Sequence, residues 1–339
     1  MKKSSRKQRI EDVHEQYGHC AVNPLFTLSE QMEFRWTKRQ VYNVFHNCAI
    51  CNAGVKLSHG KGHDTMVRKP GEVLSVDLFG PREGMYALLL TDKATGLMYG
   101  NIIDSRSEAS TARIAGLKFL INFFPMFGKH PLILRSDNEF DTAEIHDFLI
   151  SHGMKSELTA PHSSFQDVTA ERANGLIQER IRKLLKQAGA DTTFWPFAFK
   201  HCVFLNNIIP MNWKTPNPVS LAIGISLQTP TQLLAFGQEV FVHDKQEQNK
   251  LKSKGIASMF LGYAKEGFVP SLSQVILYNL TTGQIYRTES WRAQPLAFAL
   301  RQSRYKRTKL NLFASQCRKI LGLQFSAGND PSCAQDTKI

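Results

Sequence analysis

The chain has 339 residues, of which 42 % are apolar and 22 are phenylalanine, and this composition excludes a largely disordered polypeptide. Lysine and arginine number 42 against 29 acidic residues, and the net charge of +13 favours a nucleic-acid partner, although many basic proteins bind no specific polyanion. Six scattered cysteines exclude a disulfide scaffold, and there is neither a run of about 18 apolar residues nor a signal core, so we expect no membrane contact and an intracellular, reducing compartment.

Changes of composition divide the chain into segments, and its length predicts two or three folded units. The region from 58 to 70 has glycine, serine and proline among lysine and histidine without any apolar period, which is typical of a linker. The segments that we predict, in chain order, are a basic lead (1–10), a His/Cys module (11–57), that linker (58–70), a large domain (71–210), a connector (211–232), a small β-rich domain (233–297) and a tail (298–339) that begins basic and ends disordered.

The large domain begins with three strand-like runs separated by turn residues, and three such runs in sequence predict an antiparallel meander at 73–79, 86–90 and 98–103. Helical and strand-like patterns then alternate. We expect a helix at 107–124, a strand at 131–134, a helix at 143–151, a strand at 155–158 and helices at 169–188 and 195–206. The pattern at 169–188 is the clearest, because apolar residues recur in it at helical spacing and Gly189 ends it.

The β-rich domain is predicted from short apolar runs spaced by turn residues, as in a small barrel or sandwich. These runs cover 239–243, 257–263, 275–278 and 284–286. The chain therefore belongs to the α/β class, with a small helical module before the mixed domain and a β-rich region after it.

Histidines and cysteines of the first module have the spacing of metal ligands. A histidine pair and a Cys-x-x-Cys pair lie within one short segment, at His14, His19, Cys48 and Cys51. Two imidazoles and two thiolates fill a tetrahedral zinc shell, and a bound ion would stabilise a module of about 50 residues that buries little on its own. Either pair alone is more simply a chance occurrence, and His46 and Cys20 are alternative ligands in the same segment.

Three acidic residues of the large domain are candidates for a second metal site. Asp77 lies inside an apolar strand, where a charge is costly unless it is paired or binds a metal; Asp137 follows a short buried strand, and Glu171 lies in the first turn of the clearest helix. Each has a structural explanation: an ion pair for the first, an Asx turn with Asn138 for the second and a favourable helix N-terminus for the third. Together, on a basic chain, they suit two divalent ions about 3.5 to 4 Å apart in a site for phosphoryl transfer.

These segments resemble the integrase portion of the Pol polyprotein of copia-type (Pseudoviridae-like) LTR retrotransposons. The His14-to-His19 and Cys48-to-Cys51 segments are similar to its zinc module, and this similarity selects these four ligands over the alternatives. The segments similar to those around its three catalytic acids are Asp77-Leu-Phe-Gly-Pro81, Arg135-Ser-Asp-Asn138 and Ala170-Glu-Arg172. Later segments keep the family's order, so that the resemblance spans about residues 11 to 290: Phe194-Trp195, Asn206-Asn207, Lys214-Thr-Pro216, Phe236-Gly237 and Phe260-Leu-Gly-Tyr263.

The resemblance implies a fold, an activity and two kinds of metal. The fold is a ribonuclease H-like catalytic core over 71–210, a mixed five-stranded sheet with flanking helices. The activity is 3′-end processing and strand transfer of element DNA into a target, with two Mg²⁺ or Mn²⁺ ions bound by the three catalytic acids Asp77, Asp137 and Glu171. One structural Zn²⁺ is expected at His14, His19, Cys48 and Cys51.

The resemblance also implies partners and a location. Double-stranded DNA, as element ends and as target, is the expected ligand, and the expected contacts beside the acids are Asn138, Arg172, Gln178 and Arg182. A homo-oligomer that acts in the nucleus, with a cytoplasmic stage in a retrotransposon particle, is expected. The basic run at 301–309 could steer DNA or serve as a nuclear signal, and a solvated tail explains it equally well.

The sequence departs from the family pattern near the second and third acids. A Gly-Gly pair usual after the Asp-Asn step is absent before Glu139-Phe140, which shortens the loop, and Val168 stands where a glycine is usual. The helix face that follows Glu171 has no lysine or arginine before Arg182. None of these changes removes a predicted metal ligand.

Two other functions stay open beside the integrase. The departures suit a catalytically decayed or domesticated remnant that binds nucleic acid without joining it. A ribonuclease H-like nuclease that only hydrolyses DNA would explain the acids, but it leaves the zinc pair and the downstream segments without a role.

Overall fold

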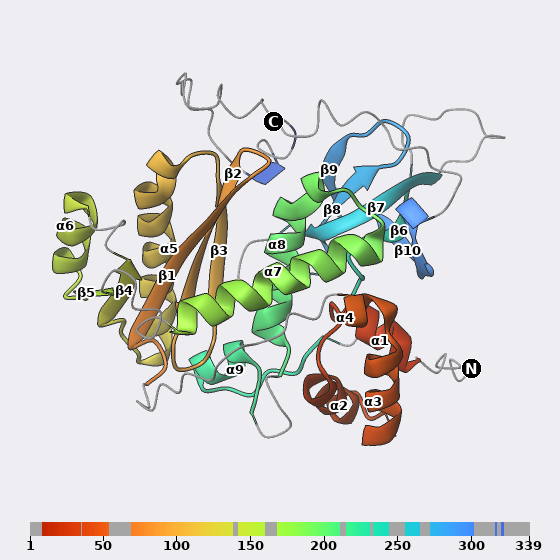
Figure 1. Cartoon of the computed structure of the whole chain (residues 1–339), viewed down its shortest axis with the longest axis horizontal. Coiled ribbons are helices and arrows are strands. Elements are labelled where there is room, and N and C mark those ends of the chain that lie inside the picture. Colours follow the sequence, from red (N-terminus) through yellow and green to blue (C-terminus); the bar gives the residue numbers. More distant parts are fainter. Residues whose placement is uncertain are drawn as a thin grey trace.

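The chain is described as a computed structural model over residues 9–34, 36–53, 69–137, 142–159, 168–210, 215–230, 233–243, 255–264, 272–301, 316 and 320–321. Most of the predicted linker, the loop after Asp137 with Asn138, and most of the tail lie outside these residues. Figure 1 shows one sheet at one end of the molecule and a second sheet and a helical module at the other. Among the described helices, none has the length and apolar character needed to cross a membrane.

The first module consists of four short helices, α1 (Ile10–Gln16), α2 (Val22–Gln31), α3 (Lys38–Asn47) and α4 (Ala49–Ala53). Helix α3 begins at a capping box, in which the Thr37 hydroxyl accepts from the backbone N–H of Gln40 and the Gln40 side chain accepts from that of Thr37. Apolar side chains of α1 to α3 meet in one small cluster. The module is helical, as the sequence predicts.

The large domain contains a five-stranded mixed sheet of β1 (Val73–Arg82), β2 (Met85–Asp92), β3 (Met98–Ile103), β4 (Ile133–Asp137) and β5 (Lys155–Thr159). The strand order is β3-β2-β1-β4-β5. The first three strands form the antiparallel meander, and β4 and β5 run parallel to β1 because each is reached through a helix. This mixed topology confirms the ribonuclease H-like fold that the resemblance implies.

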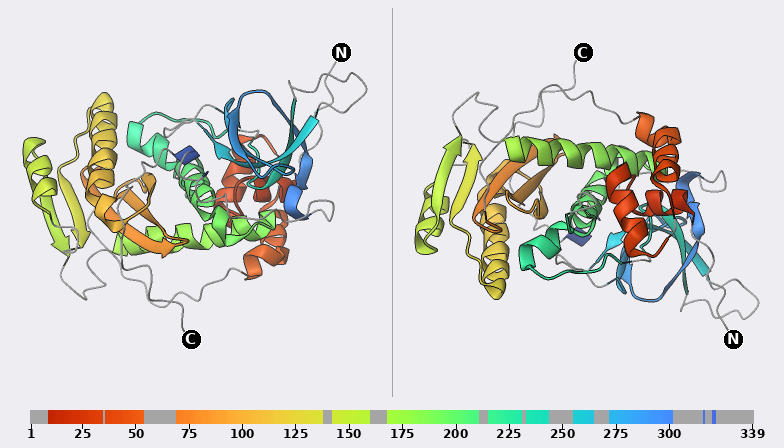
Figure 2. Two further views of the ribbon diagram at one scale, coloured as in Figure 1. Left: turned by 90° about the horizontal axis from the view of Figure 1, so that it is seen from above. Right: turned by 90° about the horizontal axis from the view of Figure 1, so that it is seen from below.

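Helices cover both faces of this sheet (Figure 2). Helices α5 (Ala109–Phe123) and α6 (Ala143–Ser151) cover one face, where they pack on alternate strand residues such as Leu74, Val76 and Leu134. Helices α7 (Val168–Ala188) and α8 (Trp195–Ile208) cover the other face, where they meet Phe79 and Leu89. The alternation places odd-numbered residues of β1 and β4 under α7 and even-numbered ones under α5.

Short 3-10 turns lead into or out of several of these elements. They are η1 (Arg106–Glu108) before α5, η2 (Phe124–Phe127) after it, η4 (Thr192–Phe194) before α8 and η5 (Ala299–Arg301) after the last strand. A short helix, α9 (Pro218–Ile223), lies in the predicted connector and is capped by Asn217, whose side chain accepts from the backbone of Ser220.

The C-terminal region forms a second five-stranded sheet, of β6 (Gln238–His243), β7 (Gly255–Tyr263), β8 (Val275–Asn279), β9 (Ile285–Thr288) and β10 (Trp291–Phe298). All its pairings are antiparallel, in the order β10-β6-β7-β8-β9. The β-rich region is confirmed, but it is one sheet rather than a barrel or sandwich. The sequence did not predict strand β10, because Pro295 interrupts its strand-like pattern. Proline has no backbone N–H to donate, and an edge strand such as β10 tolerates this loss.

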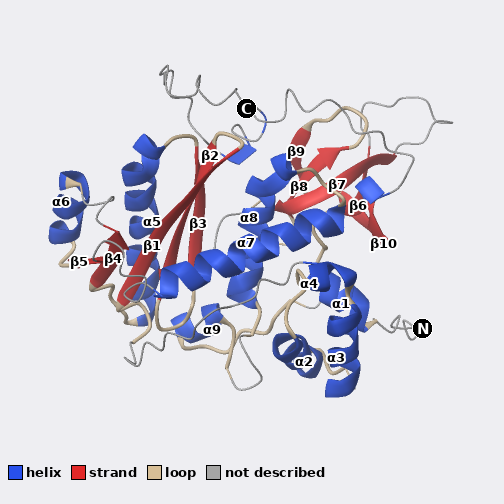
Figure 3. Ribbon diagram, in the orientation of Figure 1, coloured by secondary structure: helices blue, strands red, loops and turns tan. Residues whose placement is uncertain are grey.

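The two sheets stand on either side of α7 and α8 (Figure 3). One buried apolar cluster includes Leu89 of the first sheet, Ala188 and Phe199 of the helices, and Met259 of the second sheet. The first module joins the same helices, since its own cluster is completed by Leu205 and Ile208 of α8. The module, the core and the C-terminal sheet therefore share α7 and α8 as common packing surfaces.

Two glycines allow the other parts to approach these helices closely. A Cβ on Gly18, between α1 and α2, would lie 2.7 Å from a methyl of Leu205, and one on Gly237, before β6, would lie 2.2 Å from the Cβ of Ala188. Both glycines have positive φ, +64° and +84°, a backbone conformation that favours glycine. The chain thus requires glycine at both contacts.

Replacing Gly237 with alanine tests the contact between the second sheet and α7. We expect Gly237→Ala to lower the free energy of unfolding by about 1–2 kcal/mol for the positive φ and by roughly 1–3 kcal/mol more for overpacking against Ala188. Gly153→Ala is the matched control, because Gly153 has a φ of +66° with nothing within 4 Å of its Cβ position. Equal losses in the two variants, measured by urea unfolding, would show that the close contact does not exist.

Candidate active site and metal centre

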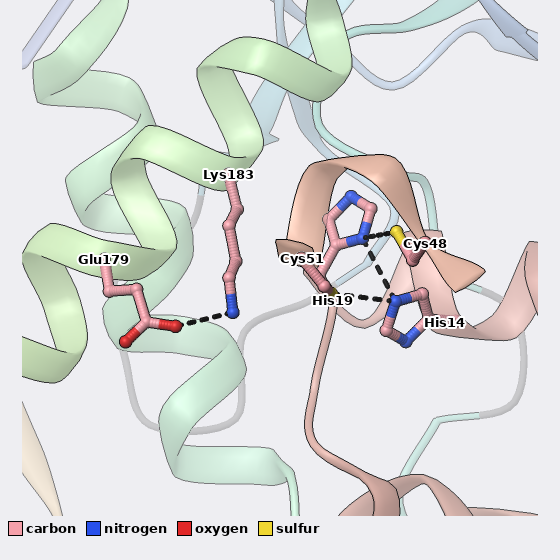
Figure 4. Close-up of polar contacts among 6 residues, drawn as sticks. All are labelled: His14, His19, Cys48, Cys51, Glu179 and Lys183. Carbon is pink, nitrogen blue, oxygen red and sulfur yellow. Dashed lines mark hydrogen bonds and ion pairs between the residues drawn. The ribbon is translucent and has the colours of Figure 1, made fainter. Parts of the chain in front are cut away.

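The four predicted zinc ligands lie in or directly after helices α1, α3 and α4 of the first module. His14 lies in α1 and His19 follows that helix in the left-handed region, with a φ of 58°. Cys48 is the C-terminal cap residue of α3, and Cys51 lies in α4. The short loop between these helices turns both sulfur atoms toward the two imidazole rings (Figure 4).

The donor atoms of these residues all lie within 4.8 Å of one another. His19 Nδ1 is 3.2 Å from His14 Nε2 and 3.4 Å from Cys48 Sγ, and Cys51 Sγ is 3.3 Å from His14 Nε2. With metal–ligand bonds of about 2.0 to 2.3 Å, tetrahedral zinc ligands stand about 3.3 to 3.8 Å apart. Both the spacing and the donor set, two nitrogens and two sulfurs, fit a zinc ion.

Packing orients the two imidazole rings. The ring of His14 meets that of His19 edge to face, with centroids 4.8 Å apart, and it meets Phe45 in the same manner. Both histidines are 2 % exposed, and the outer ring nitrogens, His14 Nδ1 and His19 Nε2, have no hydrogen-bond partner among the described groups. Aromatic and apolar neighbours, rather than the usual carbonyl or carboxylate, therefore hold these rings in place.

The two alternative ligands in the module lie outside this cluster. Cys20 is buried among apolar side chains, and burial raises the pKa of its thiol to about 12, which keeps it protonated. His46 is exposed and packs against Tyr42 with the ring planes tilted, at 3.9 Å between ring centroids. The structure brings together the four residues that the sequence selects and neither alternative.

The protonation of the cluster suits a metal site. A hydrogen bond from Cys51 is the main cause that holds the pKa of Cys48 below its ordinary value, so Cys48 is a thiolate at neutral pH. Burial is the main cause that lowers the pKa of His19, which keeps that imidazole neutral. Zinc binds thiolate and neutral imidazole, so Cys48 and His19 need little change of protonation, whereas Cys51, whose pKa is raised mainly by its hydrogen bond to Cys48, has to lose its proton.

Lys183 of α7 lies beside this cluster, and the sequence did not single it out. Its side chain is only 7 % exposed, and its ammonium group pairs with Glu179 one turn earlier, at 2.6 Å (Figure 4). Its positive charge acts on both Cys51 and His19, and in each case it lowers the pKa. Helix α7 therefore brings a positive charge close enough to the cluster to favour the thiolate form of Cys51.

The first candidate acid, Asp77, lies half-buried in β1 under α7. Its Oδ1 accepts from the backbone N–H of Leu78 at 2.7 Å, and its Oδ2 accepts from the side-chain amide of Asn174 of α7. Asn174 is 7 % exposed, and its own oxygen Oδ1 is buried without a hydrogen-bond partner among the described residues. The Asp77 carboxylate and the Asn174 amide oxygen are both hard oxygen donors. Such donors fit an ion of the magnesium type.

The second candidate acid, Asp137, ends β4 at the level of Asp77. Strands β1 and β4 are parallel, and Val73, Leu74 and Ser75 pair with Ile133, Leu134 and Arg135, a constant difference of 60 residue numbers. The same difference matches Asp77 to Asp137, two residues farther along both strands. Both are odd-numbered residues, so both belong to the face that α7 covers, about one strand spacing apart.

The third candidate acid, Glu171, lies in the first turn of α7, and its side chain lies outside the described residues. Its backbone position is three residues before Asn174, so the two residues share one face of the helix. Because Asn174 donates to Asp77, this face is the one turned toward the two aspartates. The sheet thus places Asp77 and Asp137 on one face, and α7 carries the backbone of Glu171 on the helix face that contacts Asp77.

Known proteins that are similar to the chain include Pol polyproteins of transposons. No family model matches the chain. It is 33 % identical over 281 residues, 75 % of its length, to the retrovirus-related Pol polyprotein from transposon TNT 1-94 of Nicotiana tabacum. It is 24 % identical over 311 residues, 84 % of its length, to the truncated transposon Ty1-A Gag-Pol polyprotein of Saccharomyces cerevisiae. The chain is a copia-type Pol homologue.

The copia-type chain matches 20 % and 25 % of the lengths of these two polyproteins. Two solved structures are also similar to it. A chain of the simian T-cell lymphotropic virus intasome in complex with PP2A regulatory subunit B56 gamma has 12 % identity and a TM-score of 0.47, with 85 % of this chain and 100 % of that chain covered. The catalytic core domain of BIV integrase has 16 % identity and a TM-score of 0.36, with coverages of 45 % and 95 %.

The predicted nucleic-acid contacts of the copia-type chain lie along α7, apart from Asn138, which is outside the described residues. Arg172 and Arg182 are exposed, and Gln178 is half-buried. Gln178 accepts from the guanidinium of Arg82 at 3.3 Å. Arg82 and Asn174 were missed in the sequence; the three-residue spacing from Glu171 could have pointed to Asn174, whereas only the fold brings Arg82 to the helix.

Loss of one cysteine ligand tests the metal centre. We expect the purified chain to contain about one zinc ion, and Cys48→Ser to lose it, because a serine hydroxyl is a poor zinc ligand. Elemental analysis of the gel-filtered protein measures the zinc content. Cys20→Ala, which removes a buried thiol outside the cluster, should keep the ion. Full zinc content in Cys48→Ser would contradict the assignment.

Lys183 is expected to strengthen zinc binding from α7. Lys183→Met keeps the length and apolar part of the side chain but removes the charge, and we expect zinc affinity to fall about tenfold or more, as for other residues that support metal ligands. Competition with a chromophoric chelator measures the affinity. Lys186→Met, an exposed lysine of the same helix, should change it little. If both variants bind zinc as the parent does, Lys183 has no such role.

Proposed function

We propose that the chain is a retrotransposon integrase that processes DNA 3′ ends and transfers them into target DNA by metal-dependent transesterification. One observation carries this proposal: Asp77 and Asp137 lie in the same register on one face of the sheet, under α7, the helix whose first turn contains Glu171. The homology to Pol polyproteins of copia-type transposons supports the same reaction class.

The three acids would hold two Mg²⁺ or Mn²⁺ ions. Carboxylate oxygens are the ligands that such hard ions prefer, and the partly exposed setting of Asp77 and Asp137 leaves room for a phosphate on the open side of the ions. When bound, the ions would lower the pKa of the attacking hydroxyl and stabilise the negative charge of the departing oxygen.

The chain's own residues would prepare this site. The Leu78 N–H and the Asn174 amide hold the Asp77 carboxylate in one orientation, so it need not reorganise when its ligand binds. In processing, the oxygen of water forms the new bond to phosphorus; in transfer, the 3′ oxygen of the element does so. In both steps the bond between phosphorus and the 3′ oxygen of the cut strand breaks, and that oxygen takes up a proton and leaves as a 3′ hydroxyl.

The remaining features fit an integrase that binds DNA as an oligomer in the nucleus. The net charge of +13 favours a duplex as ligand. Zinc at the His/Cys cluster would serve structure, since all four ligand positions are filled by protein and none remains for a substrate. Self-association and nuclear location belong to this proposal and rest on the homology.

Asp137→Asn tests the proposed reaction. The exposed position of Asp137 allows the substitution without disturbing a core, and loss of one metal-binding carboxylate should lower strand transfer roughly a hundredfold or more, about 3 kcal/mol in the barrier. The assay joins labelled duplexes with the terminal sequence of the element to a plasmid, with Mg²⁺ or Mn²⁺. Thermal unfolding of both proteins establishes that the fold is retained.

The products separate this proposal from its two alternatives. Joined DNA made by the parent and lost in Asp137→Asn supports the integrase. Cut ends without joined DNA indicate a hydrolytic nuclease. If the parent binds DNA but yields no more product than Asp137→Asn, the chain is a remnant that binds nucleic acid. The shortened loop before Glu139 favours this alternative.

A further inference from the structure

The face of α7 that begins at Glu171 carries few positive charges for a helix proposed to lie against DNA. From Glu171 it continues through Asn174 and Gln178 to Arg182, at helical spacings of three, four and four residues. The two middle residues are neutral amides. A duplex along this face would therefore meet no cation from the helix itself for about 16 Å, the rise of eleven residues.

The hairpin between β1 and β2 brings a cation to the middle of this gap. Arg82 and Met85 form the last pair of the hairpin, so the loop has only two residues, Glu83 and Gly84, with φ values of 50° and 72°. Two such residues form the tight turn that suits a twisted hairpin. The guanidinium of Arg82 donates to the Gln178 side chain at 3.3 Å, and both groups reach the surface.

Two hydrogen bonds from the start of α8 and the turn before it hold the hairpin tip in place. The indole N–H of Trp195 donates to the backbone carbonyl of Arg82 at 3.1 Å, and the Thr192 hydroxyl donates to the carboxylate of Glu83 at 3.2 Å. Trp195 is itself buried in the main cluster. The backbone of Arg82 is therefore anchored to the core, so little conformational freedom is lost when its side chain binds a ligand.

The charge of Arg82 is available to a ligand. Among the described residues, no carboxylate forms an ion pair with it, and its partner Gln178 is a neutral acceptor that occupies one of the five guanidinium N–H groups. A planar guanidinium with free donors binds a phosphate with two parallel hydrogen bonds. The adjacent Gln178 amide can donate to the same phosphate or to a base edge.

We infer that Arg82 and Gln178 together bind a DNA phosphate beside the candidate acids, and that Arg82 supplies the positive charge that the helix face lacks. Gln178 follows Glu171 by seven residues, about 10 Å along the helix, which corresponds to about three base-pair steps of a duplex. The pair holds the backbone about three steps from the reacting phosphate and so sets the position of the strand. This inference rests on the proposed integrase function.

Salt-dependent DNA binding tests the contact without catalysis. Fluorescence anisotropy with an element-end duplex, in buffer without Mg²⁺ or Mn²⁺, gives the slope of log affinity against log salt. Loss of one phosphate contact should reduce this slope by about one in Arg82→Ala and weaken binding severalfold. Arg82→Lys keeps the charge and should keep the slope. Arg292→Ala, an exposed arginine of β10, is the control and should match the parent.

A residue exchange gives a stricter test of the pair. The double variant with Arg82→Gln and Gln178→Arg restores a guanidinium and an amide at the same place, and it should recover the slope and the strand transfer that Arg82→Ala loses, about tenfold. An unchanged slope in Arg82→Ala, or no recovery in the exchange variant, overturns the inference. If Arg82→Ala lowers the slope as expected but the parent never joins DNA, the proposed function is overturned and the contact stands. If the parent binds no DNA, both are overturned.

Discussion

Helix α7 contacts a different part of the molecule on almost every turn, and the arrangement of the rest of the chain depends on these contacts. It has 21 residues and is thus about 31 Å long, enough to pass from one sheet to the other. Its first half is amphipathic, with Arg172 and Leu176 exposed, whereas its last turns are buried nearly all round. Its contacts in order are Asn174 with Asp77, Gln178 with Arg82, Lys183 with the His/Cys cluster, Leu184 near Gly18 and Ala188 against Gly237.

This arrangement links the metal cluster to the candidate acids through one rigid element. The cluster is held in part by α7, where Lys183 lies beside Cys51, and Glu171 lies in the first turn of the same helix, about three turns earlier. A helix transmits a shift at one end to the other because its backbone hydrogen bonds resist stretching. Loss of the metal from the first module would thus shift α7 and so disturb the candidate acids. This holds although the His/Cys cluster and the acids share no residue.

Local patterns were sufficient for most of the fold and for the ligands. Alternating apolar residues located β1 to β5, and the pair spacings located His14, His19, Cys48 and Cys51. Asp77 could be selected because a charge within an apolar strand is costly. Asp77 and Asp137 lie on one face of the sheet and Glu171 lies in the first turn of α7, while their roles, their metal ions and their chemistry stay predictions.

Other features depended on contacts between distant segments, which no local pattern reveals. Lys183 is an ordinary helical lysine in the sequence, and only the docking of α4 on α7 gives it a role. Arg82 is one of many basic residues until the hairpin brings it to Gln178. The second sheet was predicted as a barrel or sandwich because strand spacing does not specify strand order, and Pro295 concealed β10.

The packing of the first module on α8 has a practical consequence for work with shorter forms of the chain. Leu205, Ile208 and Ile209 are 1 to 4 % exposed because the module covers them, and Tyr17 donates to the carbonyl of Pro230 across the same contact. A recombinant fragment that starts at residue 71 leaves these side chains facing water as a contiguous apolar patch. Such a fragment is prone to aggregate during expression, and poor solubility would then reflect the missing cover rather than a defect of the fold.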